Sequence, residues 1–372
     1  MNIMDKLYSR ISELKNPTVA GLDTRIEYLP ESFVKEIMPE GIKSFEDAAE
    51  AVYQYNVRLV DALYDIVPSV KVQVAYYEMY GAAGMVAFEK TMAYAKQKGM
   101  IVMADVKRND IGATAACYAN AYVGMTDMPY GKVKPFSSDI ATINPYLGVD
   151  GIKPFTDACA ANGTGVFALV KTSNPSSGQL QDMKYEDGRT LYEAVADLVE
   201  EWGAETRGEM GYSVIGAVVG ATYPQQGTAL RARMPHTFFL VPGYGAQGAT
   251  GKDIAGCFDK NGNGAIVNAS RSILCAWKKQ EGVAFDVAAR NEAIRMREDL
   301  CSCLKEMGKQ DESAEDTGEV SAAADLELDS VTTMDEIALD VDVDGDIPAH
   351  ELGEIDRELS LEEKAEEEEE EA

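Results

Sequence analysis

Histidine and cysteine are scarce in this chain. Of its 372 residues only two are histidine, His236 and His350, and six are cysteine. Two histidines exclude a histidine cluster of the kind that binds zinc, and they leave a Ser-His-Asp triad only through His236. Six cysteines are too few for a disulfide-stabilised scaffold, which indicates reduced thiols in a cytosolic protein.

Long apolar runs and an excess of positive charge are also missing. No run approaches the ~20 apolar residues that a membrane-spanning helix needs. Residues 1–16 contain no apolar stretch typical of a signal peptide, so we expect a cytoplasmic protein with no membrane partner. The net charge of −29 argues against a nucleic-acid partner, because duplex binding depends on cationic side chains. Neither a G-x-G-x-x-G after the first predicted strand nor a P-loop motif occurs, which excludes those nucleotide sites.

The negative charge is concentrated near the C-terminus. Residues 311–372 contain 26 acidic and 2 basic side chains, whereas the first 310 residues contain 37 acidic and 32 basic ones. The composition changes at about residue 306, beyond which Glu and Asp dominate and no aromatic residue occurs. We therefore predict a globular domain over residues 1–305 and a disordered, acidic, low-complexity tail over residues 306–372.

One segment of the acidic tail matches a calcium-binding loop. Residues 340–351 fit the pattern D-x-D-x-D-G-x5-E, in which Asp340, Asp342, Asp344 and Glu351 would be ligands. Pro348 inside the segment, the lack of a partner loop and the acidic background favour a solvated tail instead. Both readings stay open.

Eight short runs rich in Val, Ile, Phe or Thr alternate with longer segments, several of them amphipathic. The runs are residues 18–23, 70–75, 100–107, 140–147, 165–172, 215–222, 237–245 and 265–273. Helical spacing of apolar residues is clear over 45–67, 82–99 and 190–206. Strands that alternate with helices predict an α/β protein with a parallel sheet. Eight such units favour a closed (β/α)8 TIM barrel, although a doubly wound open sheet has the same local pattern.

Each of the eight runs contains a polar residue, ends near one or is followed by one. Active sites of such barrels lie at the C-terminal ends of the strands, so these residues are the candidates for the site. They are Asp23, Lys71, Asp105 with Lys107, Asn144, Thr172 with Ser173, Thr222, Gln247 and Arg271.

Lys71 is informative because it interrupts an apolar strand. Alternation places Val70, Val72 and Val74 on one face and Lys71 on the other, which then points into the barrel and needs a negative partner. Asp105 and Lys107 also share a face. With Asp23 and Asp110, these residues predict a network of carboxylates and ammonium groups. The alternative is a buried ion-pair array without chemistry.

Two segments near the end of the barrel indicate a phosphate site. Residues 242–248 are rich in glycine and contain Gln247, and residues 269–273 contain Arg271. Loops after the seventh and eighth strands are the usual phosphate-binding place in these barrels. The alternative is an ordinary turn beside a surface arginine.

Tyr76, Tyr77 and Tyr80 are expected to pack in the core or an interface.

Residues 105–115, DVKRNDIGATA, resemble the D-x-K-R-x-D-I-x-x-T signature of orotidine 5′-phosphate decarboxylases. The segments at 21–23, 71–78, 144–151, 171–177, 218–222, 240–248 and 269–273 are similar to that family's longer, second bacterial type, in the family's order. The resemblance implies a TIM barrel that decarboxylates orotidine 5′-monophosphate to uridine 5′-monophosphate. It also implies a homodimer with sites at the interface and no cofactor or metal.

The resemblance further implies a role for each candidate residue. Lys107 resembles the lysine that protonates C6 of the pyrimidine, and Asp105 the carboxylate that faces the substrate carboxyl. Lys71 and Asp110 would complete the catalytic network, with Asp110 and Thr114 supplied by the partner subunit. The implied substrate-binding residues are Asp23 for the ribose, Thr172 or Ser173 for the pyrimidine edge, and Gln247 and Arg271 for the phosphate, with Asn144 at the same rim.

Two other functions remain open at this point. The first is a metal-dependent sugar-phosphate decarboxylase or formaldehyde-fixing synthase on the same barrel, because a D-x-K-x-x-D core also fits those enzymes. The second is a calcium-responsive binding protein that uses the acidic tail.

Overall fold

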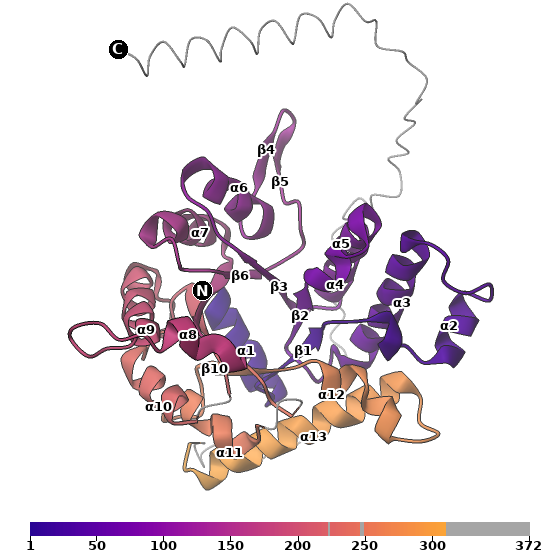
Figure 1. The fold of residues 1–372 in the computed structure, drawn as a ribbon. Helices are drawn as coiled ribbons and strands as arrows, with labels where there is room; N and C mark the ends of the chain where they lie inside the picture. The colour runs from indigo at the N-terminus through magenta and orange to yellow at the C-terminus, as the bar shows by residue number, and fades with distance from the viewer. Residues whose placement is uncertain (222–223, 246–248, 310–372) are drawn as a thin grey trace, which may run out of the picture. The chain divides into compact units, whose positions relative to one another are not determined.

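The computed structural model describes residues 1–221, 224–245 and 249–309 of the chain. Eight parallel strands in these residues form a closed barrel in the order β1-β10-β9-β8-β7-β6-β3-β2 (Figure 1). The barrel strands are β1 Thr18–Leu22, β2 Ser69–Gln73, β3 Ile101–Arg108, β6 Ile140–Ile143, β7 Gly165–Lys171, β8 Ile215–Val219, β9 Phe239–Pro242 and β10 Ala265–Ala269. Strand β1 pairs with both β2 and β10, which closes the ring. The predicted barrel is therefore confirmed, and the open sheet is wrong.

Helices surround the barrel and connect most of its strands. Their bounds are α1 Ile3–Leu14, α2 Glu31–Ile37, α3 Phe45–Leu63, α4 Ala75–Glu78, α5 Gly81–Gln97, α6 Gly112–Tyr122, α7 Val149–Asn162, α8 Gly178–Gln181, α9 Leu191–Trp202, α10 Pro224–Arg233, α11 Gly251–Ile254, α12 Arg271–Leu274 and α13 Phe285–Glu306. Helix α3 begins at a capping box in which Ser44 and Asp47 satisfy each other's backbone N–H groups. The three predicted helices are thus confirmed as α3, α5 and α9, with ends shifted by a few residues.

The core leaves only one end of the barrel open. Inside the ring, side chains such as Met103, Phe167 and Ile266 pack against Ile3 and Leu7 of α1, which covers the N-terminal ends of the strands. A larger apolar layer fills the space between the outer face of the barrel and the helices. Because that end of the barrel is filled, a pocket inside the barrel is expected at the C-terminal ends of the strands.

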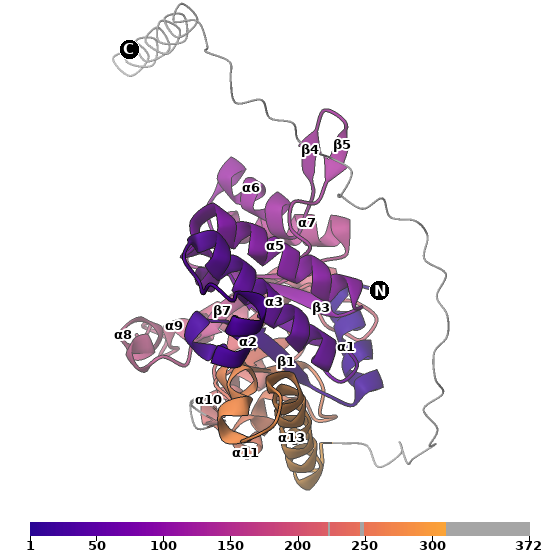
Figure 2. The same cartoon turned by 90° about the vertical axis from the view of Figure 1, so that its right-hand side faces the viewer.

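Several observed elements were not assigned from the sequence, among them a hairpin and the last helix. A small antiparallel hairpin, β4 Thr126–Met128 with β5 Gly131–Val133, projects away from the barrel beside α6 and α7 (Figures 1 and 2). The long helix α13 packs against α3 and α12.

Within the part of the chain that the structure describes, no helix is long and apolar enough to cross a membrane. The predicted tail and its calcium-binding loop lie outside the described residues, apart from the first few residues after 305, so the domain division stays a prediction.

Candidate active site

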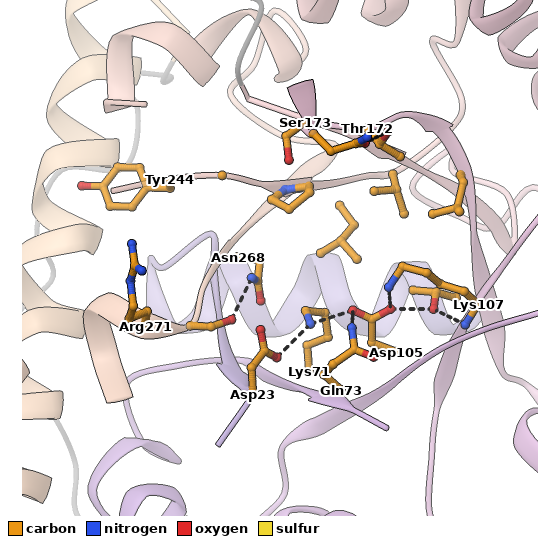
Figure 3. A pocket seen from close by; sticks show the side chains of 18 of the residues that line it. Asp23, Lys71, Gln73, Asp105, Lys107, Thr172, Ser173, Tyr244, Asn268 and Arg271 are labelled. Atoms are coloured by element: carbon orange, nitrogen blue, oxygen red, sulfur yellow. Dashed lines mark hydrogen bonds and ion pairs between the residues drawn. The ribbon is translucent and has the colours of Figure 1, made fainter. Parts of the chain in front are cut away.

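A cavity of about 560 Å³ opens at the C-terminal ends of the barrel strands (Figure 3). Every one of the eight barrel strands, or the loop that follows it, contributes to its wall. The lining residues are Asp23, Tyr28, Lys71, Gln73, Tyr76, Asp105, Lys107, Thr142, Leu169, Thr172, Ser173, Asn174, Val218, Leu240, Pro242, Gly243, Tyr244, Asn268, Ser270 and Arg271. The charged residues among them are thus brought together from β2, β3, the start of α12 and the position directly after β1.

Asp105 is the centre of the charged network. One of its carboxylate oxygens accepts hydrogen bonds from Lys71 Nζ at 2.7 Å and Gln73 Nε2 at 2.9 Å. The other accepts from Lys107 Nζ at 2.6 Å and Thr142 Oγ1 at 2.8 Å. A carboxylate with four donors is fixed in place, so both ammonium groups have defined positions.

The network holds its charges at neutral pH. Burial alone would raise the pKa of the Asp105 carboxyl, but the ammonium groups of Lys71 and Lys107 outweigh burial and hold that pKa well below its usual range. Burial would likewise lower the pKa of the Lys71 ammonium, and the carboxylates of Asp105 and Asp23 reverse this and raise it. Lys71 Nζ lies 3.3 Å from Asp23 Oδ1. The buried part of the network is therefore an ion-paired array with both signs present.

Lys107 is held in an unusual backbone conformation. Its φ is 47°, which places a non-glycine residue in the left-handed region. The pairing of β3 with β6 shifts register between Ala104 and Arg108, and the Lys107 N–H donates to Thr142 Oγ1 at 2.9 Å. The Lys107 side chain remains 45% exposed, in contrast to 5% for Lys71. Strain of this kind is typical of functional sites, and here it directs an accessible ammonium group over Asp105.

The end of the cavity opposite Lys107 contains an arginine and a tyrosine in place of the carboxylate–ammonium network. Arg271 and Tyr244 lie there, on the side away from Lys107, and Thr172 and Ser173 lie above the centre (Figure 3). Tyr244 donates to Asp299 Oδ2 at 2.7 Å, which anchors the start of the loop after β9. The guanidinium group of Arg271 is suited to a phosphate group. The cavity thus has a charged network at one end and an anion-binding group at the other.

The comparisons with known proteins agree with this geometry. Residues 41–301 match the family described as Orotidine 5'-phosphate decarboxylase / HUMPS. The chain is 43% identical over 296 residues to orotidine 5'-phosphate decarboxylase of Rhodopirellula baltica, covering 79% of this chain and 96% of that one. This chain belongs to the orotidine 5′-phosphate decarboxylase / HUMPS family.

Further members of the family show the same relationship. Orotidine 5'-phosphate decarboxylase of Clostridium botulinum strain Hall is 42% identical over 300 residues, which cover 80% of this chain and 99% of that one. The solved structure of Leishmania donovani OMP decarboxylase is 28% identical with a TM-score of 0.62, and the match covers 82% of this chain and 99% of that chain. The finer assignment to the longer bacterial type of the family stays a prediction.

The structure brings most of the residues implied by the family resemblance to the cavity. Among the described lining residues are Asp23, Lys71, Asp105, Lys107, Thr172, Ser173 and Arg271. The described lining does not include Asp110, Thr114 or Asn144. Thr114 is exposed on α6, and Asn144 Oδ1 accepts a hydrogen bond from the backbone of Tyr146 at 3.0 Å. Gln247 and Thr222 lie outside the described residues.

Several lining residues were missed by the sequence reasoning. Thr142 takes the place on β6 that Asn144 was expected to occupy. Asn268 on β10 lines the cavity, and its Nδ2 donates to Ser270 Oγ at 3.2 Å. Alternation from Ser270 back along β10 could have indicated Asn268. Tyr76 packs against the core, as expected, and in addition borders the cavity, whereas Tyr77 is fully buried.

The described residues offer no evident metal site. They contain no group of three or more His, Cys, Asp or Glu side chains arranged for this. His236 Nδ1 lies 2.8 Å from Glu200 Oε1, so the histidine considered for a triad pairs with a carboxylate outside the cavity.

Proposed function

We propose that this protein decarboxylates orotidine 5′-monophosphate to uridine 5′-monophosphate and CO2, the last step of UMP synthesis, and that it does so in the cytoplasm. The observation that carries this is the carboxylate of Asp105 held between Lys71 and Lys107, in a cavity whose far end contains Arg271. The curated relatives that share 42–43% identity with this chain are orotidine 5'-phosphate decarboxylases.

Lys107 would stabilise and then protonate the reacting carbon. Loss of CO2 from C6 leaves a carbanion that no neighbouring carbonyl group can delocalise. An ammonium group fixed beside C6 stabilises that charge and afterwards donates a proton to it. Lys107 fits this task because its side chain is accessible and its Nζ lies 2.6 Å from Asp105 Oδ1.

The neighbours of Lys107 would keep the site ready before substrate binds. Asp105 orients the ammonium group, and Lys71, paired with Asp23, prevents Asp105 from moving away. Asp23 retains 24% exposure of its side chain, so it can also accept hydrogen bonds from ribose hydroxyls. An arrangement that is rigid before binding does not have to reorganise during the reaction.

The other end of the substrate would be bound far from the reacting carbon. Arg271, together with Gln247, would hold the phosphate, and Thr172 or Ser173 would contact the pyrimidine edge. Binding energy from the phosphate is available to position C6 next to Lys107, which raises the rate and not only the affinity.

We also propose a homodimer that contributes Asp110 and Thr114 to the partner's site. Both residues lie outside the described lining of their own cavity, on a face formed by α6, α7 and the β4–β5 hairpin. This α6–α7 face exposes apolar side chains, including Ile111 at 55% and Val149 at 49%, and it contains a groove lined by Ile111 and Met125. An apolar exposed face is typical of an oligomer interface.

Mixing two inactive variants tests the dimer. Lys107→Ala and Asp110→Ala are each expected to be inactive, but in a mixed dimer one site has both residues intact if Asp110 acts across the interface. With random pairing half of the dimers are mixed and one of their two sites works, so about one quarter of wild-type activity should return. No recovery on co-expression, or a monomer in analytical ultracentrifugation, would contradict the proposal.

The decarboxylation itself is tested by the loss of orotidine 5′-monophosphate absorbance in the presence of EDTA. Turnover that is unchanged by the chelator supports the decarboxylase. Folded protein that leaves orotidine 5′-monophosphate intact contradicts it, and activity on a sugar phosphate that EDTA abolishes would support the metal-dependent alternative.

A further inference from the structure

The loop after β7 brings polar residues to the cavity and begins with a buried lysine. Thr172, Ser173 and Asn174 line the cavity, and the loop continues through α8 to Asp182. Lys171, the residue before them, is only 1% exposed and is not part of the described lining. A fully buried ammonium group beside a binding site requires an explanation, because burial of a charge is costly unless it is paired.

Lys171 points away from the cavity, toward α9. The pairing of β7 with β8 shifts register between Leu169 and Lys171, so Leu169 lines the cavity whereas Lys171 does not. The ammonium group of Lys171 lies 5.0 Å from the centre of the Tyr192 ring on α9. Its position is therefore fixed by the barrel and by α9, not by a ligand.

The loop is connected to Lys171 through Asp182. Lys171 Nζ donates to Asp182 Oδ1 at 2.6 Å, and Asp182 is the residue that ends α8. The Asp182 side chain is 46% exposed, so the carboxylate reaches inward from the surface loop to the buried ammonium group. Since Lys171 is fixed by the barrel, this ion pair fixes the far end of the loop.

A second set of hydrogen bonds closes the same loop at its start. The Thr172 N–H donates to Gln181 Oε1 at 3.0 Å, and Gln181 Nε2 donates to Thr172 Oγ1 at 2.8 Å. Thr172 Oγ1 in turn donates to Asn174 Oδ1 at 2.6 Å. The two ends of the 172–182 loop are thus held together by hydrogen bonds. Two of these bonds join Gln181 to Thr172, which lines the cavity.

We propose that Lys171 and Gln181 are positioning residues that hold the 172–182 loop so that Thr172 and Ser173 present their polar groups to the pyrimidine edge of the substrate. The proposal deepens the function proposed above and rests on it for the identity of the substrate. Neither residue touches the substrate. Lys171 acts through Asp182, and Gln181 acts through Thr172.

The test uses Lys171→Met and Gln181→Ala. Methionine keeps much of the length and leaves Asp182 solvated at the surface, so the barrel should stay folded. Gln181→Ala removes only the hydrogen bonds to Thr172. This variant still tests the proposal if Lys171→Met does not fold. Lys98→Met, which removes a lysine that pairs with Asp61 at 2.7 Å between α3 and α5, is the matched control.

Two measurements separate positioning from a general structural role. We expect KM for orotidine 5′-monophosphate to rise roughly tenfold in both variants, about the effect of one lost hydrogen bond, with a smaller change in kcat. Inhibition by inorganic phosphate should be unchanged, because the phosphate end of the cavity is not altered. Amide hydrogen exchange should increase over residues 172–182 and stay at the wild-type level elsewhere. Lys98→Met should match the wild type in every respect.

The outcomes distinguish this proposal from the proposed function. Unchanged KM and unchanged exchange over residues 172–182 in both variants would overturn it, as would increased exchange throughout the barrel. If the wild type does not convert orotidine 5′-monophosphate, the proposed function and the pyrimidine contact fail together. In that case, faster amide hydrogen exchange confined to residues 172–182 in the two variants would still show that Lys171 and Gln181 hold the loop.

Discussion

Replacement of Asp105 by asparagine removes the negative charge that both cavity lysines share. The side chain keeps its size, but one of the oxygens that accept from an ammonium group becomes an NH2 donor. Lys107 is 45% exposed and can turn to water, whereas Lys71 is only 5% exposed and keeps the more distant Asp23 at 3.3 Å. The loss in free energy of unfolding therefore comes mainly from Lys71, which stays buried with a weaker partner.

The structure gives the size and the pH dependence of this cost. Removal of one partner of a buried ion pair costs about 3–5 kcal/mol, and the remaining Asp23 favours the lower value. A loss of about 3 kcal/mol lowers Tm by roughly 6 °C in a chain of this size. The folded-state pKa of Asp105 lies below its ordinary value of 3.8, so the contribution of Asp105 to stability is present above pH 3.8 and is lost as the pH falls through the folded value. The pKa of Lys71 is raised above 10.5, so its contribution is complete below pH 10.5 and is lost as the pH rises through the folded value.

Urea unfolding at several pH values measures this prediction, with the fluorescence of the two tryptophans as the signal. The difference between wild type and Asp105→Asn should be constant from about pH 5 to pH 9 and become smaller in stronger acid. Asp61→Asn, at an ion pair with Lys98 that is partly exposed, should cost less than about 1 kcal/mol. An Asp105→Asn variant no less stable than Asp61→Asn at pH 7, or a difference that grows in acid, would refute the reasoning.

Three further substitutions give separate predictions. Lys107→Ala should lower kcat by several orders of magnitude while ligand affinity is largely kept, and in steady-state assays a kcat within about tenfold of wild type would refute the acid role. Lys107→Gly should be about 1 kcal/mol more stable to urea than Lys107→Ala, because only glycine adopts a φ of 47° without strain, and equal stabilities would contradict that strain. Arg271→Ala should weaken inhibition by inorganic phosphate about ten- to a hundredfold, the range expected for a lost charged hydrogen bond; an unchanged inhibition constant would place the phosphate elsewhere.

Much of the barrel could be predicted because its strands are short, apolar runs of distinctive composition. The β4–β5 hairpin could not, since each of its strands has three residues and their side chains are mostly exposed. Exposed strands of that length have no apolar alternation to detect. Helix α13 was missed because charged residues interrupt its apolar positions over 22 residues.

The candidate site was predictable where strand alternation determines it. Lys71 and Asp105 point into the cavity, as expected, and their strands β2 and β3 pair with each other in regular register as far as Gln73 and Asp105. Alternation would also have placed Leu169 and Lys171 on one face, but the register shift in β7 sends Lys171 outward. Tyr76 and Tyr244 reach the cavity from segments that follow strands, and neither has a periodic pattern that reveals its direction.

The five charged side chains that border the cavity have a consequence for how an anion enters it. Among the described lining residues, the carboxylates of Asp23 and Asp105 lie next to the ammonium groups of Lys71 and Lys107, and the guanidinium group of Arg271 lies at the end away from Lys107. An approaching nucleotide is therefore drawn in phosphate first. Its carboxylate then lies beside ammonium groups that Asp105 already pairs, and a carboxylate that gains little attraction in the ground state is lost more readily as CO2.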